Sequence, residues 1–96
     1  MVIGVCSITL FLPASQTLKD KRQIVQSVVT RIRNQFSVAI AEVAEQDRWQ
    51  LAELGVSCVS NDSRHAAEIL EHVRNYIEET RPDIEISNFE TEIMHW

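Results

Sequence analysis

The chain has 96 residues, of which 45% are hydrophobic and 24% are charged, and its formal net charge is −5 at pH 7. This length fits a single domain, residues 1–96, and the composition is that of a globular protein rather than a disordered or fibrous one. The negative net charge disfavours free-standing, non-specific nucleic-acid binding, because the long-range field of the domain repels phosphates. The leading apolar run, residues 2–12, is far shorter than the roughly 20 residues of a membrane span.

Met1 leads directly into that apolar run without a basic segment before it, so a secretory signal is not expected. The two cysteines, Cys6 and Cys58, lie in apolar runs and form no CxxC motif, which favours buried inert thiols over redox or metal use. We therefore expect a cytoplasmic protein. The three histidines do not lie at metal-ligand spacing, and we predict neither a metal site nor a cofactor.

Residues 2–12 are rich in β-branched side chains on both alternating faces, and Pro13 closes the run, which predicts a central strand. Thr17 and Asp20 resemble a capping box. Behind them the apolar positions fall within an arc of about 140° on a helical wheel. This predicts an amphipathic helix over about residues 18–34, with Asn34 as the C-cap.

Residues 36–43 alternate larger and smaller side chains, which predicts a second strand with Phe36, Val38 and Ile40 on its core face. A turn near residues 46–48 leads into a third strand, which begins near Trp49 or Leu51 and ends at Ser60. Gly55 inside this strand suggests a bulge.

Residues 61–63 carry a strong N-cap signal for a second amphipathic helix, which ends just before Pro82. The last run, residues 84–93, predicts a half-solvated strand, and its apolar phase shifts between Ile86 and Phe89, where we expect a bulge. The order β-α-β-β-α-β predicts a ferredoxin-like α+β fold, a four-stranded antiparallel sheet with both helices on one face. The first and third strands would be its central strands.

One face of that sheet would have no helix to cover it. If Cys6, Ile8 and Leu10 face the helices, the opposite face presents side chains from three strands, namely Ile3, Val5, Thr9, Phe11, Ala39, Ala41, Val43 and Val59. Such a face is an interface for a second copy or for another protein, or else a mixed, partly wet surface with scattered apolar residues.

Charge is divided unevenly along the chain. Residues 15–36 carry a net charge of +4, and residues 37–96 carry −9. Lys19, Arg22 and Arg33 lie within about 60° of one another on the helical wheel. This stripe could meet RNA phosphates locally, or it could be a solvated helix face whose cations pair with nearby acids.

Signals for an enzyme are weak. Glu42 and Asp47 flank the predicted turn, and Trp49 follows, but solvation of a turn explains these carboxylates at least as well as acid–base chemistry. The chain has no glycine-rich phosphate loop and no nucleophile elbow. The third strand also lacks the stacked aromatics of an RNA-recognition motif. We predict no catalytic residues.

Several segments stand in an order that resembles the YlxP-like family of small bacterial proteins, a group of unknown function. They are Leu12-Pro13, Ser15-Gln-Thr-Leu-Lys-Asp-Lys-Arg22, Arg33-Asn-Gln-Phe36, Val38-Ala-Ile-Ala-Glu-Val43, Asp47-Arg-Trp-Gln50, Leu54-Gly-Val56 and Ser60-Asn-Asp62. The resemblance covers nearly the whole chain. It implies a ferredoxin-like fold and, because genes of the family often lie beside those of translation factors, a role in ribosome maturation or translation.

The resemblance implies no catalytic residue. Under this resemblance the partner would be ribosomal RNA or a ribosome-assembly protein. The basic residues of the predicted helix would contact it, through the phosphates in the case of RNA, and they are Lys19, Lys21, Arg22 and Arg33. Asp47, Trp49 and Gln50 would form a recognition or structural corner at the hairpin, and for Trp49 we favour the simpler role of a hydrophobic lid on the core. The alternative to this RNA- or partner-binding module is a homodimeric interaction or regulatory module that uses the open sheet face, with Ile3, Val5, Phe11, Ala39 and Ala41 at the interface.

Overall fold

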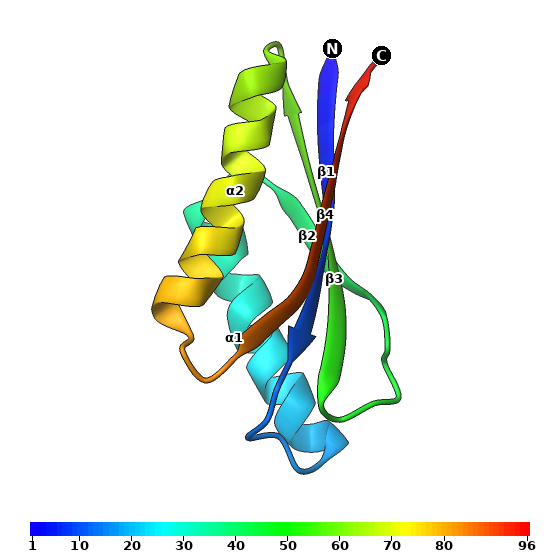
Figure 1. Ribbon diagram of the computed structural model, residues 1–96, viewed down its shortest axis with the longest axis vertical. Coiled ribbons are helices and arrows are strands. Elements are labelled where there is room, and N and C mark those ends of the chain that lie inside the picture. The colour runs from blue at the N-terminus through cyan, green and yellow to red at the C-terminus, as the bar shows by residue number, and fades with distance from the viewer.

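The computed structural model describes all 96 residues and contains four strands and two helices. In chain order these are β1 (Val2–Phe11), α1 (Leu18–Gln35), β2 (Ala39–Ala44), β3 (Leu51–Ser60), α2 (Ser63–Thr80) and β4 (Glu85–His95). The sheet order is β2-β3-β1-β4, and every neighbouring pair is antiparallel. Both helices lie on the same side of the sheet (Figure 1). The predicted ferredoxin-like α+β fold is confirmed, with β1 and β3 at the centre.

Alternation along β1 decides which side of the sheet meets the helices. Its even-numbered residues from Val2 to Leu10 are buried, and its odd-numbered residues from Ile3 to Phe11 are only half-buried. Because side chains alternate between faces in a strand, a single choice of phase at Cys6, Ile8 and Leu10 sets the phase of the whole sheet. These residues join α1 and α2 in one hydrophobic core of 18 buried residues. Of the two phases open to β1, the structure has the one that turns Cys6, Ile8 and Leu10 towards the helices.

The junction between α1 and β2 differs from its prediction. The helix continues to Gln35, and Phe36, in an extended conformation, is the C-cap, its N–H donating to Ile32 O. Asn34 is therefore not the cap, and no left-handed residue is needed at this helix end. The strand begins at Ala39 rather than Phe36, although Phe36 and Val38 still pack against the core.

Two register shifts mark the outer strands. In β4 the pairing passes from Asn88 to Ile86, so Ser87 is the extra residue, and the predicted bulge is confirmed. The bulge predicted at Gly55 is wrong, because Gly55 pairs regularly with Ala41 and the shift lies in β2, at Val43. An added Cβ on Gly55 would approach Val43 Cγ1 to 2.9 Å. The glycine makes room for the side chain of the bulged residue.

Both helices begin as the sequence indicates. Thr17 Oγ1 accepts from Asp20 N at 3.0 Å, and Asp62 Oδ1 accepts from Arg64 N at 2.8 Å. These side chains satisfy amide groups of the first turns, which have no partner inside the helix. Neither α1 nor α2 combines the length and the apolarity that crossing a membrane requires.

Candidate functional site

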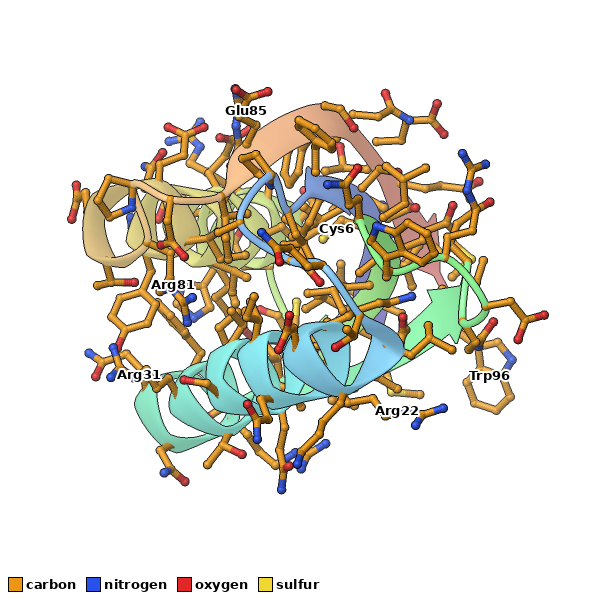
Figure 2. All side chains as sticks on the ribbon, turned by 90° about the horizontal axis from the view of Figure 1, so that it is seen from below. Cys6, Arg22, Arg31, Arg81, Glu85 and Trp96 are labelled. Carbon is orange, nitrogen blue, oxygen red and sulfur yellow. The ribbon has the colours of Figure 1, made fainter.

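The solvent side of α1 carries cations without acidic partners. Lys19, Arg22, Arg31 and Arg33 are exposed, and none of the four has a carboxylate oxygen within 4.0 Å. Arg33 instead donates through Nη2 to Ile40 O at 2.9 Å, which ties the end of the helix to β2. Arg22 extends from α1 on the side away from α2, while Arg31 lies towards the other end of the helix on the side facing α2 (Figure 2). Of the two interpretations of the stripe of Lys19, Arg22 and Arg33, pairing with nearby acids is therefore not observed.

Lys21 does not belong to this surface, which corrects the expectation that it contacts phosphates. Its side chain is 1% exposed, and its Nζ lies 2.9 Å from Glu42 Oε2. The ammonium also donates to Glu45 O. The buried Oε2 of Glu42 has no hydrogen-bond donor other than this ammonium. The pair therefore joins the first turn of α1 to the β2–β3 hairpin.

A signal for this burial was present in the sequence and was missed. Lys21 precedes Ile24 by three residues and Val25 by four, so it falls inside the apolar arc of α1 rather than beside Lys19 and Arg22. A cation at such a position must find a partner when the helix docks. Glu42, on the neighbouring edge strand, provides it.

Glu42 and Asp47, the two carboxylates considered for acid–base chemistry, have different surroundings in the structure. Glu42 forms the buried ion pair with Lys21, and Asp47 lies in the exposed β2–β3 loop. Glu45, the one non-glycine residue with a positive φ, 67°, turns the chain at the start of this loop and accepts from Arg48 N at 3.1 Å. No group of three His, Cys, Asp or Glu side chains is close enough to hold a metal ion.

The hairpin corner carries an open pocket. It has a volume of about 420 Å³ and is lined by Phe11, Asp47, Arg48, Trp49, Gln50 and Leu51. Trp49 is 52% exposed and does not belong to the core, so its predicted role as a hydrophobic lid is wrong. Gln50 has a structural role. Its side-chain Nε2 donates to Ser15 O at 3.2 Å, and its main-chain carbonyl oxygen accepts from Leu12 N at 2.9 Å.

The open sheet face has apolar ends and a small-residue middle. At one end Ile3 lies between Val59 and Met94, and at the other Phe11 lies opposite Leu51. Between these ends lie the small residues Ser7, Thr9, Ala39, Ala41, Gly55 and Ser57, together with Val5, which pairs with Ser57, and Glu53, which pairs with Thr9. Along β4 the same face carries the glutamates Glu85, Glu90 and Glu92, opposite Phe11, Ser7 and Val5. This acidic border does not follow from the apolar positions alone, and only the strand register reveals it.

Both cysteines are free and buried. Burial, together with the nearby Cys58 and Glu71, raises the pKa of the Cys6 thiol to about 11. Cys58 Sγ lies 3.8 Å from Ala66 O, to which it donates. The Cys6 thiol therefore stays protonated at neutral pH, and both cysteines line the core beside α2.

Comparison with known proteins identifies the family of the chain. Residues 3–91 match the family model described as a protein of unknown function, DUF503. The chain is 34% identical over 76 residues to the uncharacterized protein YlxP of Bacillus subtilis (strain 168), covering 79% of this chain and 82% of that relative. The chain therefore belongs to the DUF503 family, of which YlxP is a relative.

Proposed function

We propose that this protein is a non-enzymatic accessory module, active in the cytoplasm in ribosome maturation or translation, which contacts RNA through the exposed cations of α1. The single observation that carries the proposal is the lack of acidic partners for Lys19, Arg22, Arg31 and Arg33 in a chain with 14 acidic residues. Unpaired surface cations leave their field free to attract phosphates at short range.

The distribution of the other cations supports this interpretation. Arg48, Arg74 and Arg81 each lie within ion-pair distance of a carboxylate, and Lys21 is buried against Glu42. Only Arg64 shares the unpaired state of the α1 cations. The acids outnumber the cations in residues 37–96, which carry a net charge of −9, and α1 is left as the basic element of the molecule.

The test is binding to ribosomal RNA and to purified ribosomal subunits at several salt concentrations. Three phosphate contacts would make the logarithm of the affinity fall with the logarithm of salt with a slope of about −2 for single strands. The variant Lys19→Gln/Arg22→Gln should weaken binding by about 10-fold at low salt and flatten this slope, because each lost contact removes a counterion-release contribution.

Arg64→Glu is the matched control. It changes the net charge by the same amount as the double variant, and Arg64 is exposed at the start of α2, at the opposite end of the molecule from the start of α1 (Figure 1). If the control weakens binding as much as the double variant, only overall charge matters, and the proposed α1 surface is wrong. Undiminished RNA and subunit binding by Lys19→Gln/Arg22→Gln would also contradict the proposal.

The second candidate function is a homodimeric interaction or regulatory module that uses the open sheet face. The exposure of Val59, 67%, and of Val43, 52%, favours it. It ranks second because the glutamates of β4 share this face. A charge introduced on this face by Val5→Glu or Ala41→Glu should dissociate such a dimer, and sedimentation equilibrium measures the fraction of dimer. A wild-type monomer at high concentration would exclude this candidate.

A further inference from the structure

The pocket at the hairpin corner has no role in the proposed α1 surface, and its chemistry points to a ligand. We propose that this pocket binds a nucleobase of single-stranded RNA, stacked on the indole of Trp49. The inference rests on the proposed function and specifies which part of the RNA the protein takes up.

The lining of the pocket combines an aromatic surface with polar groups. Trp49 is 52% exposed, and Phe11 and Leu51 supply the other apolar walls. Every base has an aromatic face, so a half-exposed indole in an open pocket binds bases by stacking without demanding one sequence. The carboxylate of Asp47 can accept a hydrogen bond from a base N–H.

The contacts around Gln50 and Lys21 hold this pocket beside the start of α1. Gln50 bonds to both Leu12 and Ser15, which places the end of the hairpin loop against the β1–α1 loop. Lys21 fastens the first turns of α1 to Glu42 and Glu45 of the same hairpin. The β2–β3 loop and the start of α1 accordingly lie at the same end of the molecule (Figure 1).

This arrangement lets one strand of RNA meet both features. Lys19 and Arg22 lie in the first two turns of α1 and carry the unpaired charge, while Arg48 at the rim of the pocket is 65% exposed and pairs with Glu45 only at 3.5 Å. A base in the pocket would therefore have its phosphates between Arg48 and the start of α1. An apolar side chain of a protein partner would contact the apolar walls of the pocket but would not interact with these cations.

The test uses the full chain and a fluorescently labelled single-stranded RNA of about ten nucleotides, with anisotropy as the readout. Trp49→Ala should lower the affinity roughly 10- to 100-fold, the range of base–aromatic stacking. The slope of affinity against salt should not change, because stacking releases no counterions. Trp49→Phe should restore most of the affinity. In a Trp96→Phe background, RNA should also quench the fluorescence of Trp49, the remaining tryptophan.

Two further probes separate the sources of binding. Inorganic polyphosphate has the charge of RNA but no bases, so Trp49→Ala should bind it as well as the wild-type protein does. A mononucleotide should bind at least ten times more weakly than the oligonucleotide. If the mononucleotide bound as tightly as the oligonucleotide, the assignment of the ligand as RNA would be wrong. If Trp49→Ala weakened polyphosphate binding as much as RNA binding, the proposed stacking would be wrong.

The result also distinguishes this inference from the proposed function. If Trp49→Ala binds RNA normally while Lys19→Gln/Arg22→Gln does not, the base pocket is wrong, the α1 surface stands, and the pocket is left to a side chain of a protein partner. If the wild-type protein binds neither RNA nor polyphosphate, both proposals fail.

Discussion

The buried ion pair between Lys21 and Glu42 offers the sharpest test of how the hairpin is held. Lys21→Met keeps the length and the apolar stem of the side chain but removes the ammonium. Glu42 then keeps a carboxylate whose Oε2 is buried and has no other donor, and Glu45 O keeps only its hydrogen bond from Arg48 N. Removing one member of a fully buried pair costs about 3–5 kcal/mol. Because Glu42 is 22% exposed, water replaces part of that interaction, and we expect a loss of about 2–3 kcal/mol.

The assay is urea unfolding followed by circular dichroism. With a slope of roughly 1–1.5 kcal/mol per molar urea for a chain of this size, Lys21→Met should lower the midpoint by about 2 M. Lys19→Met is the control, because Lys19 lies two residues earlier and is exposed and unpaired. A surface substitution of this kind should change the free energy of unfolding by less than about 0.5 kcal/mol.

A double-mutant cycle isolates the pair. Glu42→Gln leaves the buried ammonium without a counterion and should destabilise by an amount similar to Lys21→Met. The double variant Lys21→Met/Glu42→Gln buries no charge and should be more stable than either single variant, so the coupling energy should be at least about 2–3 kcal/mol. Additive effects within about 0.5 kcal/mol, or a Lys21→Met variant as stable as the wild type, would refute the reasoning.

Three further outcomes follow from the packing and the titrating groups. Gly4→Ala should lower the melting temperature because the new Cβ would lie 3.0 Å from Cys58 Sγ, and Cys58→Ala should recover part of the loss, which thermal unfolding of the double variant measures. Both thiols are buried, so they should react slowly with an alkylating reagent at pH 8 in the folded protein and rapidly in urea. Because the pKa of Cys6 is raised to about 11 in the folded state, its thiol ionises first in the unfolded state, and the free energy of unfolding should fall as the pH rises from 9 to 11. Hydrogen bonds from the Arg81 guanidinium to Asp83, at 2.7 and 3.0 Å, lower the pKa of that carboxyl. The stability that this interaction adds is present above about pH 4 and is lost as the pH falls through the lowered pKa, so the unfolding curves of the wild type and Asp83→Asn should converge in acid.

Neighbouring basic residues at the start of α1 have different roles, although the sequence alone shows them as one basic segment. The segment Leu18–Arg22 contains a residue that holds the hairpin, Lys21, and residues that face solvent, Lys19 and Arg22. Variants of Lys21 should therefore affect stability, and variants of Lys19 and Arg22 should affect binding. A charge scan that treats the segment as one basic patch would mix the two effects.

The sequence by itself determined the elements of this protein. Apolar, β-branched side chains on both faces of residues 2–12 predicted a central strand, and helical periodicity after Thr17 and Asp62 predicted two amphipathic helices. Which face of the sheet the helices cover was left open, because a strand that is apolar on both faces fits either phase. The change of phase before Phe89 located the bulge of β4, since an extra residue is the simplest way to keep both halves of the strand facing the core.

Only the tertiary structure decided what the polar residues do. Lys21 lies more than about twenty residues before Glu42 and Glu45 in the chain and meets them because α1 docks beside the hairpin. Trp49 lies outside the core because the β2–β3 loop turns at Glu45 and carries it past the end of the sheet. An apolar face repeats along an element and is visible locally, whereas an ion pair or a pocket depends on the distance between elements, which is set when the whole core packs.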